Sequence, residues 1–219
     1  VLFAIIASVA PAASQTPFSD AASPLFNDST LHELRLRMNE QDWQALVDNY
    51  DRDTYYPADV VWGAQIVRNI GIRSRGSGSR NPNKPGIKLD FNRYVSGQRM
   101  LGLNALVLDN LWQDPALIRE RVAMKLFERM HVVAPRESYA TVWVNDLYLG
   151  VYALVESVDS RFLRRPGLDR DGFLFDYEWQ DTWWFTDLGD DLEPYEARFQ
   201  PETREDDSSS ALHGTIRDF

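Results

Sequence analysis

Short runs in which apolar and polar residues alternate recur along the chain, and they limit its fold more than any other feature. In ELRLRM (33–38), leucine and methionine share one face and glutamate and arginine share the other, as in a half-buried strand. The run from 58 to 76 is typical of a β-hairpin that turns near Gly63. A second hairpin is predicted over 140–159, with its tight turn at Asn145 and Asp146.

Two further strands and several helices complete the pattern. GIKLDF (86–91) and the run around ALVLDN (105–110) are predicted strands. Helices are predicted from Asn39, a good N-cap, over 39–50, and in shorter form over 160–165 and 210–219.

The longest predicted helix covers 113–130, with Asp114 as its cap and Pro115 in its first turn, where a missing N–H costs nothing. Its apolar residues repeat every fourth position, in a stripe of the kind that faces a core. The members of this stripe are Ile118, Val122, Leu126 and Met130.

The order of these elements is β-α-ββ-β-β-α-ββ-α. Strands joined by hairpins form antiparallel pairs, and the helices stand between the runs of strands. The sequence therefore predicts an α+β fold built on an antiparallel sheet.

The segment between Gly71 and Leu89 collects basic residues although the net charge of the chain is −10. It contains no acidic residue, and its basic residues are Arg73, Arg75, Arg80, Lys84 and Lys88. Glycines let a backbone approach phosphate closely, and Arg and Lys supply charge-assisted hydrogen bonds to phosphate oxygens. Two interpretations stay open: a cradle for a polyanionic ligand, or a solvated basic hairpin loop.

Composition excludes several classes of function. The acidic balance argues against general nucleic-acid binding, for which a basic stripe is expected. The chain has no cysteine, so disulfides, thiolate metal sites and a cysteine nucleophile are excluded. The three histidines form no metal-like pair, and neither HExxH nor Gly-x-Ser-x-Gly is present.

The first residues indicate export. VLFAIIASVA (1–10) followed by small residues matches the apolar region and cleavage zone of a secretory signal peptide, here assigned to 1–14 with an incomplete N-terminus. The mature protein is expected to begin between Ala13 and Thr16, followed by a linker over 15–30. The alternative is a buried strand. The run is too short for a transmembrane helix, which needs about 20 apolar residues, so the expected location is secreted, cell-surface or periplasmic.

Six segments, in order over roughly 31–180, resemble the spore-coat-protein-H (CotH) kinase family. They include GIRSRG (71–76), KPGIKLDF (84–91), DPALIRE (114–120) and VNDLYLGVYALVE (144–156). Each motif has modest specificity, and the order of all six segments is what distinguishes the family. The resemblance implies an atypical protein-kinase-like N-lobe with the start of a C-lobe over 31–219. It also implies ATP with Mg²⁺ or Mn²⁺ as cofactors and transfer of phosphate to Ser or Thr of secreted or coat proteins.

By position, the resemblance makes Lys88 the strand lysine that contacts phosphate. It places Asp114 and Arg119 with Glu120 on the helix that orders the site, and Glu156 with Val158 on the adenine side. The remaining cofactor-binding residues that it implies are Lys84, Arg73, Arg75, Gly76, Ser77, Gly78 and Ser79.

One departure from the family pattern concerns 181–219, where neither the catalytic Asp-and-Asn segment nor the metal-binding Asp segment is matched. We therefore expect these 219 residues to be C-terminally incomplete, to hold no catalytic or metal-binding residue, and to transfer no phosphate by themselves. A non-catalytic surface or coat-assembly module on the same fold is the alternative function. A carbohydrate-binding module that uses Trp179, Trp183 and Trp184 is a further one.

Overall fold

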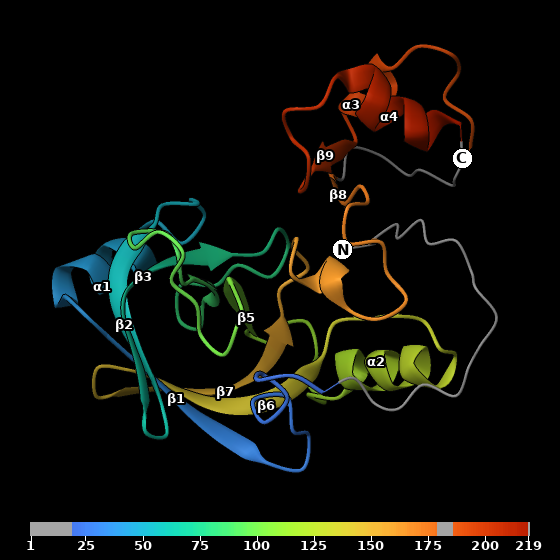
Figure 1. The fold of residues 1–219 in the computed structure, drawn as a ribbon. Coiled ribbons are helices and arrows are strands. Elements are labelled where there is room, and N and C mark those ends of the chain that lie inside the picture. Colours follow the sequence, from blue (N-terminus) through green and yellow to red (C-terminus); the bar gives the residue numbers. More distant parts are fainter. Residues whose placement is uncertain (1–18, 179–185, 219) are drawn as a thin grey trace. The chain divides into compact units, whose positions relative to one another are not determined.

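The computed structural model describes residues 19–178 and 186–218, and these form two compact units (Figure 1). The first unit contains residues 19–157, and the second contains residues 158–178 and 186–218. The predicted signal peptide and the three tryptophans of the carbohydrate-binding alternative lie outside the described residues. No helix of the described part is long and apolar enough to span a bilayer.

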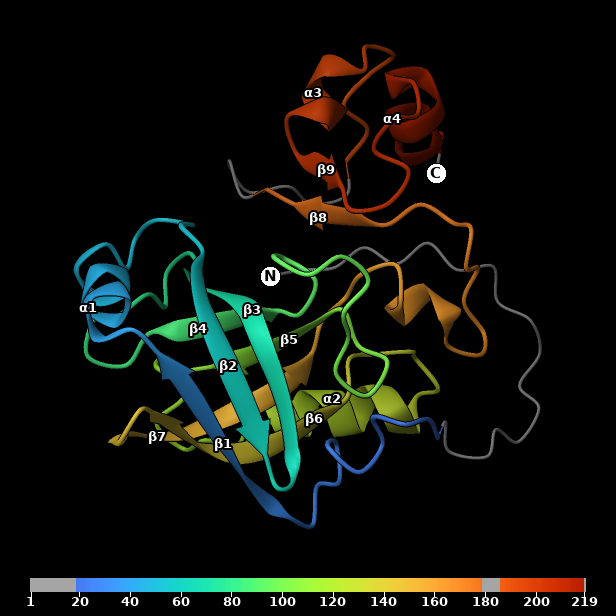
Figure 2. The ribbon, with the colours of Figure 1, turned by 60° about the vertical axis from the view of Figure 1, so that its left-hand side comes forward.

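The first unit is a closed seven-stranded β-barrel with the strand order β1-β2-β3-β4-β5-β7-β6 (Figures 1 and 2). Neighbouring strands pair antiparallel except β1 and β6, which pair in parallel from Leu31 opposite Tyr139 to Leu36 opposite Val144 and so close the barrel. The strands are β1 (Leu31–Met38), β2 (Tyr56–Trp62), β3 (Gln65–Arg75), β4 (Gly86–Asp90), β5 (Ala105–Asp109), β6 (Glu137–Val144) and β7 (Leu147–Glu156).

The predicted α+β fold, with an antiparallel sheet and a kinase-like N-lobe, is therefore wrong. The strands were predicted at the right places, and both hairpin turns are confirmed, since Trp62 pairs with Gln65 and Val144 with Leu147. The parallel contact between β1 and β6 joins segments more than 100 residues apart. Alternation within a strand fixes which side chains face inward, but it carries no information on which distant strand is the neighbour.

The barrel interior is filled by the inward-facing residues of all seven strands. Fully buried examples are Leu34, Ile72, Leu89 and Leu154, from β1, β3, β4 and β7. The region 19–30, predicted as part of a linker, adds Ala22, Leu25 and Phe26 to the same core. Burial of these side chains is the main stabilising contribution to the unit.

Helix α1 (Glu40–Asp48) is confirmed with its cap, because the Asn39 side chain accepts a hydrogen bond from the Gln41 backbone N–H at 2.8 Å. Helix α2 (Arg119–Arg129) begins later than predicted. Leu117 has a positive φ of 56°, which a helix cannot accommodate. Asp114 instead accepts from the backbone N–H groups of Ile118 and Arg119, at 2.7 and 2.6 Å, and caps the helix from a preceding turn.

The apolar stripe of α2 does not face a core, as its spacing had predicted. The exposed fractions are 52% for Ile118, 56% for Val122, 54% for Leu126 and 61% for Met130. The helix lies beside β6 on the outside of the barrel, and none of its residues is buried (Figure 2).

The second unit has a smaller core. Its elements are a 3₁₀ turn (Phe162–Arg164), β8 (Phe175–Tyr177), α3 (Glu193–Glu196), β9 (Phe199–Pro201) and α4 (Ser209–Arg217). Strands β8 and β9 pair antiparallel, and Phe175, Tyr195, Phe199 and Leu212 form a buried cluster. His213 lies in this unit with its ring between the Ser209 hydroxyl at 3.1 Å and the Phe199 carbonyl at 2.9 Å, which is a structural role.

Candidate functional site

The predicted site residues of β3 and β4 lie on the outer face of the barrel. Strand register aligns Arg73, Lys88, Val107, Val155 and Glu137 in one row across β3, β4, β5, β7 and β6. Their neighbours along each strand point into the core, so the whole row points outward. The row begins with two cations and ends with an acid, with two valines between them.

The glycine-rich loop between β3 and β4 is tightly held. Gly76 has a φ of 117°, and a Cβ at this position would lie 2.6 Å from the Ser79 hydroxyl, so a side chain there would be strained. The buried Asn110 side chain donates to the carbonyls of Ser79 and Lys84, at 2.8 Å each. Loop geometry is therefore fixed near both of its ends, while Ser77 and Gly78 at its tip are exposed.

Three of the five basic residues in this segment pair with acidic residues from outside it, and two of these three share Asp53. Asp53 pairs with Arg73 at 2.8 Å and also with Arg80. Arg80 in addition donates to the carbonyls of Gly76 and Tyr50. Arg73 and Arg80 thus serve mainly to attach the loop to the segment that follows α1.

The other three basic residues differ in how they are held. Arg75 lies 3.8 Å from the Asp109 carboxylate. The Lys84 ammonium donates to the Val151 carbonyl at 2.8 Å and lies 4.8 Å from the centre of the Tyr152 ring. Burial lowers the pKa of Lys84, and the charge of Asp109 opposes this effect.

Lys88 is the cation of this face best placed to meet a ligand. It is half-buried, between Arg73 on β3 and Val107 on β5. Within residues 19–178 and 186–218 its ammonium has no hydrogen-bond or ion-pair partner. A half-buried ammonium without a partner is a group that an external anion would stabilise.

Acidic residues gather near the start of α2. Partial burial raises the pKa of Glu120 to about 7, with the charge of Asp109 adding to the effect and Arg75 opposing it. Burial likewise raises the pKa of Glu137 to about 7, and the charge of Glu120 adds to it. Glu137 is 8% exposed, and neither of its carboxylate oxygens has a hydrogen-bond partner among the described residues. Glu120, which the resemblance places on the helix that orders the site, forms no ion pair with Lys88.

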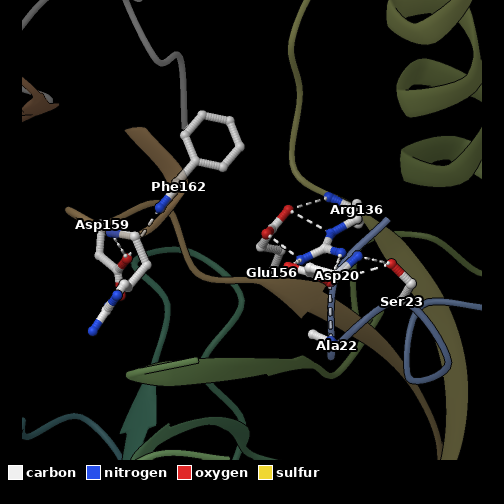
Figure 3. Close-up of polar contacts among 8 residues, drawn as sticks. Asp20, Ala22, Ser23, Arg136, Glu156, Asp159 and Phe162 are labelled. Carbon is white, nitrogen blue, oxygen red and sulfur yellow. Dashed lines mark hydrogen bonds and ion pairs between the residues drawn. The ribbon is translucent and has the colours of Figure 1, made fainter. Parts of the chain in front are cut away.

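Glu156, expected on the adenine side, is held by Arg136 (Figure 3). Its carboxylate accepts from the Arg136 guanidinium at 2.7 Å and from the Arg136 backbone N–H at 3.1 Å. Arg136 also pairs with Asp20 at 2.7 Å. The Glu156 backbone N–H donates to the Arg136 carbonyl at 2.9 Å. The carboxylate and the backbone N–H of Glu156 therefore both have partners within the protein. Val158 is the first residue of the second unit.

Sequence reasoning missed Asp53, Asp109, Asn110 and Glu137. The Asp-Asn pair at the end of the predicted strand over 105–110 was a usable signal, because strand ends often carry site residues. Glu137 precedes the predicted hairpin over 140–159, so the predicted elements did not place it on a strand. Asp53 stands in a loop 20 residues before Arg73, and no sequence pattern links the two.

The described residues fit a phosphate group better than a metal ion. Lys88 and Arg75 stand next to a glycine-containing loop, which suits phosphate oxygens. No group of three or more His, Cys, Asp or Glu that could hold a metal ion occurs in the described ranges. These residues therefore offer no complete ligand set for the Mg²⁺ or Mn²⁺ that the resemblance implies.

Comparison with known proteins agrees with the motifs. Residues 72–217 match the sequence model of a family described as CotH kinase protein. The inner spore coat protein H of Bacillus subtilis (strain 168) is 30% identical over 151 residues, which cover 68% of this chain and 40% of that protein. The chain thus spans about two fifths of the length of that curated relative. The match confirms the resemblance, and the chain belongs to the CotH kinase protein family.

Proposed function

We propose that this protein supplies the phosphate-binding face of an ATP-dependent phosphotransferase that modifies Ser or Thr on spore-coat or other exported proteins. The observation that carries the proposal is Lys88, a half-buried cation without a partner among the described residues, on the strand that returns from the glycine-rich loop. Membership of a family described as CotH kinase protein supports the same reaction class.

The residues have separate roles in this proposal. Lys88 and Arg75 neutralise phosphate charge, and Asn110 keeps the loop in a fixed shape next to them. Transfer of a phosphoryl group depends on positioning and on charge stabilisation, so fixed cations beside a rigid loop contribute directly. A bound metal ion would supply further charge neutralisation. Its ligands would not be a group of three or more His, Cys, Asp or Glu from the described residues, because these contain no such group.

We also propose that the protein leaves the cytoplasm and acts at the spore coat or another exported location. The support is the apolar run followed by small residues at the start of the chain and the name of the curated relative, a spore coat protein. Mass spectrometry of the mature protein should find its first residue between Ala13 and Thr16. Cytosolic protein with an intact VLFAIIASVA segment would contradict export.

The central test is ATP binding by Lys88→Ala in the whole protein, measured by calorimetric titration. A charge-assisted bond to phosphate is worth about 1.5–3 kcal/mol, so we expect the affinity to fall about 10- to 100-fold. The melting temperature should not change, because the ammonium has no partner within the described residues. Arg37→Ala, which removes an exposed cation of β1, is the matched control.

Transfer of labelled γ-phosphate from ATP to a Ser-rich coat protein, with Mg²⁺ or Mn²⁺, should fall in parallel with ATP affinity. Unchanged affinity together with a lowered melting temperature would show that Lys88 is structural. Absence of any ATP binding by the whole wild-type protein would refute the phosphotransferase proposal.

A further inference from the structure

The exposed apolar face of α2 forms one wall of a groove that the phosphotransferase proposal does not use. The groove has a volume of about 540 Å³. Its apolar lining consists of Leu117, Ile118, Val122 and Leu126 together with Tyr139 of β6. Single exposed apolar residues are ordinary on a protein surface, but a contiguous apolar groove marks an interaction site.

The charged residues that line the groove are all basic, and they are Arg121, Lys125 and Arg129. Arg121 and Lys125 share one carboxylate, that of Asp28, at 2.7 and 3.0 Å, and Lys125 also pairs with Glu128 at 2.9 Å. Arg129 has no ion-pair partner in the part of the chain that the structure describes. A surplus of positive charge therefore borders the apolar groove, on a chain whose net charge is −10.

We propose that this groove is a docking site for an acidic amphipathic helix of a partner protein. The apolar residues repeat every fourth position along a helix about 16 Å long, which matches the spacing of anchors on a second helix. Acidic side chains beside those anchors would lie near Arg129 and the other cations of the groove. The inference is independent of ATP binding.

A membrane surface fits the groove less well than a helix does. A helix that lies on a bilayer presents a convex apolar face, whereas Tyr139 of β6 makes the second wall of a hollow here.

The test uses synthetic helical peptides of about 16 residues and the whole protein, with binding read by fluorescence anisotropy. One peptide carries leucines at positions i, i+4 and i+8 with glutamates beside them. A second has lysines in place of the glutamates, and a third has the composition of the first in scrambled order. We expect saturable one-to-one binding of the first peptide and at least about tenfold weaker binding of the other two.

Leu126→Ser should weaken binding of the acidic peptide at least about fivefold. Leu147→Ser, at a leucine with 55% exposure against 54% for Leu126, is the matched control and should stay within about twofold. Arg129→Glu should weaken binding of the acidic peptide about threefold and strengthen binding of the lysine peptide, because it reverses a charge beside the groove. Circular dichroism of each variant checks that the fold is retained.

Four outcomes would overturn the proposal. They are equal binding of the acidic and scrambled peptides, equal binding of the acidic and lysine peptides, binding that Leu126→Ser leaves unchanged, and absence of peptide binding. Phosphatidylglycerol vesicles that bind the wild type but not Leu126→Ser, while the peptide does not bind, would assign the groove to a membrane. Sedimentation that shows a dimer lost in Leu126→Ser would assign it to a second copy of the chain.

Discussion

At the scale of single residues, Lys88 and Glu137 stand at different places in one outward-facing row and share one property. Lys88 is a half-buried cation and Glu137 a buried acid, and neither the ammonium nor the carboxylate has a hydrogen-bond partner within the described ranges. Buried polar groups are normally paired, because an unpaired one loses its hydration without compensation. Such residues weaken a fold, and they are therefore the first places to look for a role outside stability.

The pKa of Glu137 gives a prediction for stability against pH. The folded value of about 7 exceeds the ordinary value of 4.5, so between these pH values the folded state binds more protons than the unfolded state. Stability should therefore fall as pH rises from about 4.5 to 7 and then level off. Glu137→Gln should reduce the difference in melting temperature between pH 5 and pH 8, as measured by thermal denaturation.

The pKa of Glu120 is raised as well, so part of the pH dependence of stability should remain in Glu137→Gln. Glu33→Gln, at an exposed position of β1, should leave the pH profile unaltered. A Glu137→Gln profile identical to that of the wild type would show that Glu137 is solvated and ionised across this range.

At the scale of elements, the glycine-rich loop depends on a residue outside it. Asn110→Ala removes the donor to the carbonyls of Ser79 and Lys84, and a lost buried hydrogen bond costs about 1–3 kcal/mol. We expect faster amide hydrogen exchange over 76–85 and weaker ATP binding in the whole protein. Gln113→Ala is the control, because its exposed side chain makes one bond of 3.2 Å to Gly78. Unchanged hydrogen exchange in Asn110→Ala would show that the loop keeps its conformation without the Asn110 hydrogen bonds.

Element positions were largely predictable and their partners were not. The hairpin turns at Gly63 and at Asn145, and the cap at Asn39, come from local backbone chemistry, so the sequence indicated them directly. The predicted start of α2 was wrong because Asp114 and Pro115 have the sequence pattern of a cap and a first turn. Leu117 has a left-handed backbone conformation, so the helix begins after it. Its exposed stripe shows that helical periodicity identifies an apolar face without identifying what covers it.

The candidate site was predictable to a similar degree. Lys88, Arg75 and the glycine-rich loop lie together as the motifs suggested, since they are close in sequence. Arg73 is paired with Asp53 and Glu156 with Arg136, and both partners come from distant segments. Asp53 and Arg136 lie just outside strands, so these contacts form only when the folded barrel brings the distant segments together.

At the scale of the whole molecule, Arg136 joins the region before β1 to the end of β7. It lies between Glu156 on β7 and Asp20, so one side chain connects residues 136 positions apart. Arg136→Ala should lower the free energy of unfolding by about 3 kcal/mol, because it leaves the buried Glu156 carboxylate without this cation. Denaturant titration measures the change.

Asp20→Asn is the matched comparison and should cost less, because the Asp20 side chain is 33% exposed. A similar cost for both variants would place the main contribution in the Asp20 pair. A Glu156→Gln variant that loses ATP affinity with little loss of stability would show that Glu156 acts in nucleotide binding.

The parallel pairing of β1 with β6 has a consequence for the order of events during synthesis. Strand β1 ends at Met38, yet its paired segment of β6 ends at Val144, so the barrel can close only after the ribosome has added 106 further residues (144 − 38). Until then β1 keeps one edge of unpaired backbone groups, and pairs so distant in sequence form slowly. A nascent chain of this protein therefore exposes an open sheet until β6 has been synthesised, a stage at which chaperone binding would limit aggregation.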